Sequence, residues 1–368
     1  MIEFEQVSKV YDDGTVAVEG LTLQAPTGQL TVLIGPSGCG KTTSMRMINR
    51  LIDPTSGRIS LDGVDTQTIN RVELRRKIGY VIQNAGLFPH RTIVDNIASL
   101  PRLLGTKKDN ARAKALQLLE RVGLDVKLAD RYPWQLSGGQ QQRVGVARAL
   151  ATDPPILLMD EPFSAVDPIT RTQLQDEFLR LQSDIGKTIV MVTHDIDEAL
   201  KLGDQVAVLR QGGLLAQLTT PAHLLAHPAD PFVADFVGNA RGYHALSFVP
   251  AERSVPIAQE LVARIGDRVS ECPSTPGGWI LVVSDSGAPL GWVQMSSATE
   301  ATICANDVNI SGTVAPVSGT LRDMLNSALS SPTGRGVVVD GNGSLLGTVS
   351  AEDIVLAIRK AKTGVLAS

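Results

Sequence analysis

The sequence predicts an α/β fold over roughly its first 235 residues, followed by a second unit of different composition. Short, continuous apolar runs alternate with segments of helical periodicity, which is typical of central strands covered on both faces. Beyond about residue 243, Gly, Ser and Val become more frequent and charged residues rarer. A chain of 368 residues is also long enough for about two domains.

The expected strands occupy residues 30–34, 78–83, 155–160 and 188–194, each an apolar run bounded by polar or turn-forming residues. A helix is expected over residues 110–124, stopping near Gly123, which is a suitable C-terminal cap. The segment 205–218 is expected to form a hairpin with Gly212 and Gly213 as a two-residue turn. These elements predict an α/β core with some antiparallel additions.

Composition and charge exclude several classes of protein. The hydrophobic content of 43% suits a globular protein with a core, and the net charge is −4 without a block of five or six like charges. An electrostatic nucleic-acid footprint is therefore not expected. The first residues lack the charged and apolar regions of a signal peptide, and no run of 18 apolar residues occurs. Three scattered cysteines fit a reducing cytoplasm: Cys39, Cys272 and Cys304.

The segment GPSGCGKTT at residues 35–43 fits the pattern G-x-x-x-x-G-K-[ST], and it lies between an expected strand and an expected helix. Such a loop wraps backbone N–H groups around a β-phosphate, its lysine neutralises the β- and γ-phosphates, and the hydroxyl after the lysine can ligate Mg²⁺. The alternative is a glycine-rich turn with an exposed lysine. The predicted ATP-binding residues are Gly35, Pro36, Ser37, Gly38, Cys39, Gly40, Lys41, Thr42 and Thr43. Cys39 is expected to be alkylated by thiol reagents, with ATP protecting it.

Polar side chains at the ends of other expected strands complete a candidate catalytic site. Asp160 would hold Mg²⁺ and Glu161 would polarise the attacking water. His194 could reach a γ-phosphate, Gln83 could ligate Mg²⁺ or the water, and Tyr11 could stack on adenine. Alone, the two carboxylates could be solvated acids at a strand end, and each of the other three could be an ordinary surface or core residue.

A second candidate anion site begins at residue 136. Ser137 is a good N-cap, two glycines follow, and an amphipathic run continues to residue 150. The alternative is an ordinary capped helix. The residues of this loop are Leu136, Ser137, Gly138, Gly139 and Gln140.

The second unit contains an internal repeat. Residues 281–294 align with residues 337–350 at a constant offset of 56, with six identical pairs in 14 positions. Each copy predicts a strand, a turn and a second strand. Trp279 and Trp292 are expected to be core residues of these strands.

These motifs, in this order, resemble the ATP-binding subunit of ABC transporters over residues 1–237. The resemblance identifies Tyr11 with the A-loop, residues 35–43 with Walker A, and Gln83 with the Q-loop. It identifies LSGGQ at 136–140 with the signature motif, Asp160 and Glu161 with Walker B, Asp167 of SAVD with the D-loop, and His194 with the H-loop. It implies a P-loop domain with a RecA-like core, an antiparallel β subdomain and a helical subdomain.

The resemblance also implies a mechanism. Two subunits pack head to tail, so that the signature loop of one chain closes on the γ-phosphate held by Walker A of the other. ATP and Mg²⁺ are the implied ligands, with Thr42, Gln83 and Asp160 as metal ligands. Glu161, His194 and Gln83 are the implied catalytic residues.

The absence of a membrane span beside a single cassette implies separate membrane permease subunits and an external substrate-binding protein, as in bacterial importers, at the cytoplasmic face of the membrane. Residues 49–63 and 74–105 are similar to the uptake family for glycine betaine, proline betaine, carnitine and choline. An importer for another polar solute such as an amino acid, or a soluble ABC ATPase without a transport role, stays open.

After a linker at 238–244, residues 245–368 resemble a smaller α+β tandem CBS domain, with the second copy at about 315–368 and a divergent first copy. Asp353 occupies the position at which CBS pairs often hold a ribose hydroxyl, whereas Ser297 occupies it in the first copy. The unit could sense a nucleotide or ionic strength, or serve only as a dimerisation module. Arg359, Lys360 and Lys362 make only a small positive patch.

Overall fold

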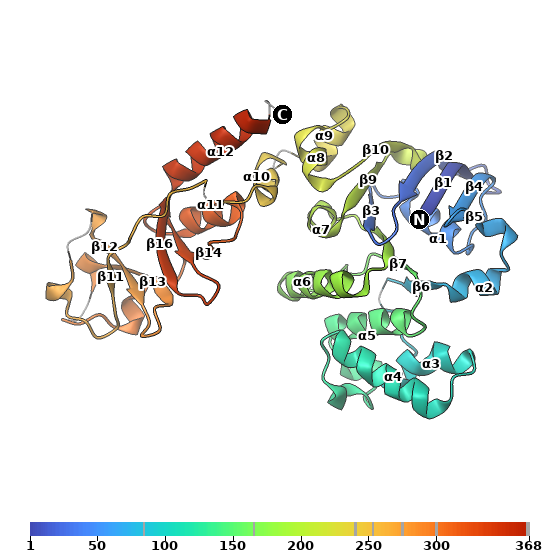
Figure 1. The fold of residues 1–368 in the computed structure, drawn as a ribbon, viewed down its shortest axis with the longest axis horizontal. Coiled ribbons are helices and arrows are strands. Elements are labelled where there is room, and N and C mark those ends of the chain that lie inside the picture. Colours follow the sequence, from blue (N-terminus) through green and yellow to red (C-terminus); the bar gives the residue numbers. More distant parts are fainter. Residues whose placement is uncertain are drawn as a thin grey trace. The chain divides into compact units, whose positions relative to one another are not determined.

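The computed structural model describes the chain except residues 84, 165, 239–240, 252–253, 274–275, 299–300 and 366–368. It divides into two compact units, Met1–Gly238 and Asn239–Ser368 (Figure 1). Within the described residues, no helix has both the length and the apolar character needed to cross a membrane.

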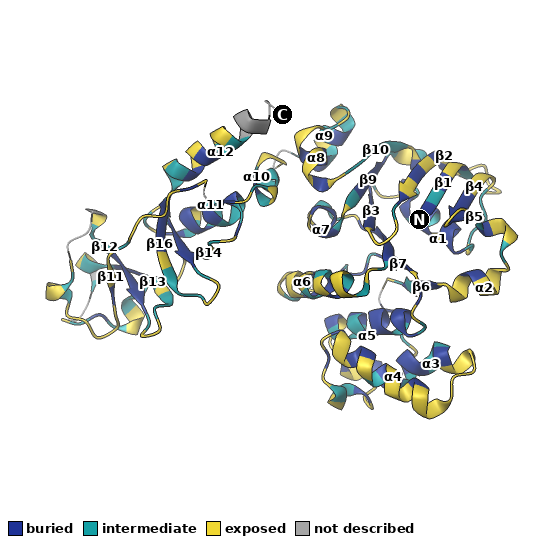
Figure 2. Cartoon of the chain, viewed as in Figure 1, coloured by how far each residue is buried: buried dark blue, intermediate teal, exposed yellow. Residues whose placement is uncertain are grey.

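The first unit is built around a six-stranded sheet of strand order β10-β9-β3-β8-β7-β6. Its strands are β3 (Leu30–Ile34), β6 (Ile78–Val81), β7 (Ile156–Asp160), β8 (Thr188–Val192), β9 (Gln205–Leu209) and β10 (Leu215–Thr219). All neighbouring strands are parallel except β9 and β10. Every residue of β3, β7 and β8 is buried, which explains their continuous apolar sequences (Figure 2). The four predicted strands are confirmed, but three of them, β6, β7 and β8, are shorter than predicted.

A smaller antiparallel sheet, of order β2-β1-β4-β5, packs with helix α1 (Lys41–Ile48) onto the strands of the larger sheet. Its strands are β1 (Ile2–Val10), β2 (Val16–Ala25), β4 (Ser56–Leu61) and β5 (Val64–Asp65). Helix α2 (Arg71–Arg76) leads into β6.

Helices α3 (Ile93–Leu103), α4 (Lys108–Arg121) and α5 (Gly138–Leu150) pack together as a helical group. Helix α4 ends two residues before Gly123, whose φ of 72° is the left-handed cap that the sequence predicts. The remaining helices of this unit are α6 (Pro168–Ile185), α7 (Ile196–Leu202), α8 (Pro221–Ala226) and α9 (Pro231–Val237).

The hairpin formed by β9 and β10 is confirmed, but its predicted two-residue turn is wrong. The Arg210 N–H donates to the Leu214 carbonyl, so these two residues are still paired. The loop between them therefore contains three residues, Gln211 to Gly213. Both glycines have left-handed backbone, with φ of 79° and 67°. The glycine pair therefore predicts the position of the turn correctly, whereas the length of the turn depends on which residues of β9 and β10 are paired.

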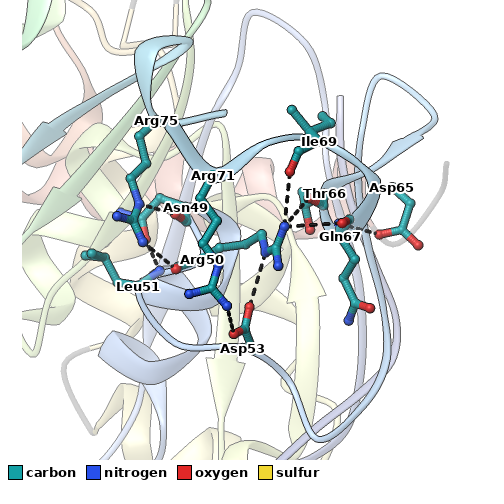
Figure 3. A network of polar contacts seen from close by, with 10 residues as sticks. All are labelled: Asn49, Arg50, Leu51, Asp53, Asp65, Thr66, Gln67, Ile69, Arg71 and Arg75. Carbon is teal, nitrogen blue, oxygen red and sulfur yellow. Dashed lines mark hydrogen bonds and ion pairs between the residues drawn. The ribbon is translucent and has the colours of Figure 1, made fainter. Parts of the chain in front are cut away.

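A polar network holds the end of α1 against the segment before β6 (Figure 3). The Arg50 guanidinium donates to the carbonyls of Thr66, Gln67 and Ile69 and pairs with Asp53. Arg75 of α2 donates to the last carbonyls of the α1 region, those of Asn49 and Arg50. These bonds satisfy carbonyls that a helix end leaves without partners.

The second unit contains two three-stranded sheets. One comprises β11 (Val262–Ala263), β12 (Trp279–Val283) and β13 (Pro289–Gln294), and the other comprises β14 (Val314–Pro316), β15 (Arg335–Val339) and β16 (Leu345–Ser350). The pairing of β12 with β13 and of β15 with β16 has the same register after a shift of 56 residues, including the same irregularity after Val282 and Val338. The structure thus repeats what the sequence repeats.

The two copies differ in their helices. The second copy contains α11 (Leu321–Ser330) and α12 (Ala351–Val365), and α10 (Arg241–Ala245) lies earlier in the unit. At the corresponding places in the first copy, the described residues form only short 3-10 turns, Val269–Glu271, Met295–Ser297 and Ala305–Asp307. The predicted divergence of the first copy is therefore a loss of helices rather than of strands.

Gly291 and Gly347, one in each copy, occupy equivalent sites. Each has a left-handed backbone, with φ of 146° and 152°, and each lies against the chain that precedes the other copy. A Cβ on Gly291 would lie 2.4 Å from the Asn309 carbonyl oxygen, and one on Gly347 would lie 2.3 Å from that of Ala258. The repeat therefore retains glycine because no side chain fits there. Of the two predicted core tryptophans, Trp292 is fully buried and Trp279 is half-buried.

Candidate nucleotide-binding site

The loop between β3 and α1 requires glycine at several positions. Gly35, Gly38 and Gly40 have φ of 152°, 75° and 97°. A Cβ on Gly35 would lie 2.3 Å from the Leu209 carbonyl oxygen, and one on Gly40 would lie 2.2 Å from that of Ala17. The loop is thus compressed against neighbouring backbone, and its curvature directs N–H groups inward in the manner of an anion-binding nest.

Lys41 is a buried cation in this loop. Lys41 is the first residue of helix α1, and only 7% of it is exposed. Its Nζ donates to the carbonyls of Gly35 at 2.7 Å and Pro36 at 3.0 Å. Both acceptors are neutral, so they do not balance the charge. A buried ammonium is stabilised by a charged partner, and an entering phosphate group would supply one.

Thr42 and Asp160 meet across the site. The Thr42 hydroxyl donates to Asp160 Oδ1 at 3.2 Å, and Asp160 lies at the end of β7 with 5% exposure. Hydroxyl and carboxylate oxygens are the ligands that Mg²⁺ prefers. The donor set therefore fits a magnesium ion beside the phosphate loop.

Three predicted catalytic residues come together at the ends of adjacent strands. Gln83 Nε2 donates to Glu161 Oε2 at 3.3 Å, and His194 Nδ1 lies 3.1 Å from Glu161 Oε1. Gln83 and His194 were expected to end their strands, but each lies two residues beyond, after Val81 and Val192. The sheet order β8-β7-β6 explains the convergence, since parallel strands end at one edge.

Glu161 has a strained backbone. Its φ is 45°, in the left-handed region that few residues other than glycine adopt. The conformation is held by its N–H, which donates to the Val192 carbonyl at 2.9 Å, and by Ser164 Oγ, which donates to the Glu161 carbonyl at 2.9 Å. Strain of this kind is concentrated at functional sites.

Tyr11 stands at the mouth of the site. Its hydroxyl lies 3.5 Å from Thr43 Oγ1, the Lys9 ammonium lies 5.4 Å from its ring centroid, and it is 38% exposed. A cavity of about 420 Å³ connects these parts. It is lined by Tyr11, Thr15, Val16, Ala17, residues 37–43, Glu161, His194 and Gln211. Sequence reasoning did not identify Gln211, which reaches the cavity from the β9–β10 loop, or residues 15–17, which lie at the start of β2 and carry no motif.

Comparisons with known proteins decide the family. A family model described as "ABC transporter" matches residues 18–164. The osmoprotectant import ATP-binding protein OsmV of Salmonella typhimurium is 43% identical over 373 residues, covering 99% of this chain and 97% of the relative. The chain belongs to the ABC transporter ATPase family. As a member it binds ATP, and we refer to Met1–Gly238 as the cassette.

Other relatives match about two thirds of the chain or less. The glycine betaine/carnitine/choline transport ATP-binding protein OpuCA of Bacillus subtilis is 54% identical over 241 residues, covering 66% of this chain and 63% of the relative. Among solved structures, the dimeric cassette MJ0796 bound to ADP and Pi is 34% identical, with a TM-score of 0.54, covering 60% of this chain and 99% of that one. The cassette cbiO1 of Clostridium perfringens is 28% identical, with a TM-score of 0.57, covering 62% and 91%.

The predicted signature loop, residues 136–140, lies at the start of α5 and outside the residues that line the cavity. Ser137 Oγ accepts the Gln140 N–H at 3.3 Å, and Gln140 Oε1 accepts the Ser137 N–H at 3.0 Å. This reciprocal capping box confirms the predicted N-cap and fixes the loop. Leu136 is buried beneath it, whereas Gly138 is exposed and Gly139 is buried.

Asp167 of the predicted D-loop caps helix α6. Its carboxylate accepts the Thr170 N–H at 3.0 Å, and this bond lowers the pKa of Asp167. The capped turn precedes Ile169, which is 77% exposed. Like the signature loop, this segment lies outside the residues that line the cavity.

Cys39 does not have the reactivity expected of it. Its side chain is fully buried, Lys41 Nζ donates to Sγ at 3.8 Å, and burial raises the pKa of the thiol. Alkylation requires the thiolate and access to it. Packing therefore already protects this cysteine, and bound ATP is not needed for protection.

In the second unit, Asp353 takes part in a helix cap. Ser350 Oγ accepts the Asp353 N–H at 3.0 Å and donates to Asp353 Oδ2 at 2.6 Å, at the start of α12. The expected contact with a ribose stays a prediction. Arg359 and Lys360 are exposed on α12, while the side chains of Ser297 and Lys362 lie outside the described ones.

Proposed function

We propose that this chain is the ATP-hydrolysing subunit of an importer for a quaternary amine osmoprotectant such as glycine betaine, proline betaine, carnitine or choline. The observation that supports it is the 43% identity to an osmoprotectant import ATP-binding protein across 99% of the chain, second unit included. Relatives that match about two thirds of the chain have names that specify glycine betaine, carnitine or choline transport.

In this proposal, the chain's own residues divide the work of hydrolysis. The phosphate loop and Lys41 hold the terminal phosphates, and Thr42, Gln83 and Asp160 hold a Mg²⁺ ion, which would neutralise phosphate charge. Glu161 accepts a proton from the attacking water as the general base. His194 and Gln83, each within 3.3 Å of the Glu161 carboxylate, orient it.

The proposed complete site needs two copies of the chain. The cavity is lined by the phosphate loop, Tyr11, Glu161 and His194, whereas residues 136–140 of the same chain lie elsewhere. In a head-to-tail homodimer, the exposed helix start at Ser137 would approach the γ-phosphate held by the other copy, where an N-terminus favours an anion. Closure would also expel water from the site.

We propose that a helix of a membrane permease docks in the groove after Gln83, at the cytoplasmic face of the membrane. A hollow of about 920 Å³ lies there. Its lining includes Tyr80, Gly86, Phe88, Arg91, Leu100 and Leu103. Apolar and cationic side chains of this kind suit an amphipathic helix. An external binding protein would then deliver the solute, which the ATPase never contacts.

The test is uptake of radiolabelled glycine betaine, carnitine and choline into vesicles that contain the chain with its permease and binding protein. Internal salt is varied, because the second unit is proposed to sense ionic strength or a nucleotide. Uptake that needs ATP and rises with salt supports the substrate class and a regulatory second unit. Hydrolysis without uptake of any quaternary amine refutes the substrate class and points to another polar solute.

A further inference from the structure

The carboxylate of Asp160 has two differently occupied oxygens. Oδ1 accepts from Thr42 Oγ1 at 3.2 Å, on the side of the phosphate loop. Oδ2 accepts from the Tyr80 hydroxyl at 3.4 Å and lies 3.6 Å from Arg46 Nη2. One oxygen thus faces the proposed metal, and the other is held from behind.

The two rear partners come from elements that already build the site. Arg46 lies one helical turn after Thr42 on α1, so their side chains share one face of the helix. Tyr80 lies on β6, which is hydrogen-bonded to β7 and runs parallel to it toward Asp160. Behind the carboxylate, these side chains line a cavity of about 370 Å³ that is separate from the nucleotide cavity.

The pKa values of Arg46 and Tyr80 reflect their closeness to each other and the burial of the phenol. A hydrogen bond with the Tyr80 hydroxyl is the main cause that raises the pKa of Arg46, and burial raises the pKa of Tyr80. The Tyr80 hydroxyl donates to Asp160 Oδ2, and the Arg46 guanidinium lies beside the same oxygen. These two contacts fix the orientation of the Tyr80 O–H bond and of the carboxylate.

We propose that Tyr80 and Arg46 are positioning residues that orient Asp160 for its metal ion. By holding Oδ2, they prevent rotation of the carboxylate and keep Oδ1 beside the Thr42 hydroxyl. Partners of this kind raise the affinity of a ligand set without touching the metal. The inference rests on the proposed magnesium site of the preceding section.

Two substitutions test it with little change in charge or shape. Tyr80→Phe removes one hydroxyl and retains the ring. Arg46→Lys keeps the positive charge near Asp160 but loses the planar guanidinium. The matched controls remove the same groups elsewhere: Tyr243→Phe, whose hydroxyl donates to Asn326, and Arg112→Lys, which pairs with Asp130 at 2.8 Å.

The probe is Mn²⁺, titrated into the full chain with bound ATP analogue and followed by electron paramagnetic resonance. We expect Tyr80→Phe and Arg46→Lys each to weaken Mn²⁺ binding about tenfold, the effect typical of residues that orient a metal ligand. Nucleotide affinity in EDTA and the thermal midpoint should stay unchanged. In hydrolysis assays, half-saturation should need more Mg²⁺, while the saturated rate is retained.

Unchanged Mn²⁺ affinity in Tyr80→Phe would overturn the inference, provided that Asp160→Asn weakens binding. A lowered plateau rate at saturating Mg²⁺, with unchanged Mn²⁺ affinity, would equally overturn it, because it indicates a general structural loss. If Asp160→Asn also leaves Mn²⁺ binding intact, the proposed metal site itself is wrong and this inference falls with it.

Discussion

Arg50→Met tests whether a single buried guanidinium holds the end of the phosphate-loop helix to the segment before β6 (Figure 3). The Arg50 side chain is 14% exposed, and its Nη1 donates to three carbonyls at 3.1–3.2 Å. Methionine retains most of the apolar stem. It also retains the left-handed backbone at this position, where φ is 52°, so backbone strain does not change.

The magnitude follows from which acceptors water can reach. Gln67 is exposed and its carbonyl can turn to solvent, whereas Thr66 is 2% exposed and Ile69 is half-buried. Losing two such bonds to a charged donor costs about 1.5 kcal/mol each, the lower end of the range for charged groups, because the site is partly exposed. The ion pair with Asp53, which is 43% exposed, adds less than ~1 kcal/mol. We expect a local destabilisation of about 3 kcal/mol.

Hydrogen–deuterium exchange of the full chain measures this locally. Peptides that cover residues 41–52 and 64–77 should exchange about a hundredfold faster in Arg50→Met, since 1.4 kcal/mol corresponds to about tenfold. The control is Arg71→Met, which removes the other pair to Asp53 from a side chain that is 54% exposed. It should change exchange by no more than about fivefold. Equal effects of the two substitutions would refute the reasoning, because burial would then not matter.

Three further predictions concern the site and the repeat. Glu161→Gln should lower the single-turnover hydrolysis rate by about 10²–10⁴-fold with unchanged ATP-analogue affinity, and near-normal hydrolysis would contradict its role as base. Gly347→Ala should destabilise the second unit by about 3 kcal/mol, from the left-handed backbone and two bonds to Ala258. The control Gly343→Ala has open space around the added Cβ and a φ of 81°, so it should cost only about 1 kcal/mol of stability. Hydrogen exchange over residues 335–350 compares the two variants. Maleimide should label the two partly exposed cysteines of the second unit before it labels Cys39, and mass spectrometry of the native protein measures this order. Early labelling of Cys39 would contradict its burial.

Sequence predicts the site well where chemistry restricts residue type and spacing together. The phosphate loop needs glycines, a lysine and a hydroxyl at fixed intervals, and the structure shows the backbone contacts that impose the glycines at 35 and 40. The strands beside it are recognisable because β3, β7 and β8 are buried throughout. Periodicity could not give the exact strand ends, since Gln83 and His194 belong to the turns that follow.

Residues that act through others carry no such restriction. Tyr80 and Arg46 lie in ordinary strand and helix patterns, and only their distances to Asp160 distinguish them. Gln211 reaches the cavity because the β9–β10 loop is one residue longer than its glycine pair indicates. In the second unit, by contrast, the repeat was detectable from six identical pairs, and for one of them, Gly291 and Gly347, the same steric contact requires glycine in both copies.

The arrangement of strands places Gln83 where it can contribute to both the proposed ATP hydrolysis and the proposed permease docking. It donates to Glu161 at 3.3 Å, and the chain that follows it lines the groove proposed for the permease, with Gly86 and Phe88 in its wall. Arg148 of α5 donates to the carbonyls of Ala85 and Gly86, so this segment is also attached to the helix that begins at the signature loop. A displacement of α5 during dimer closure would therefore pull on residues 85–86 and, through the chain that joins them, on Gln83. The proposed groove and the proposed general base are thus connected by hydrogen bonds and a few residues of chain, which is the coupling that an ATP-driven importer requires.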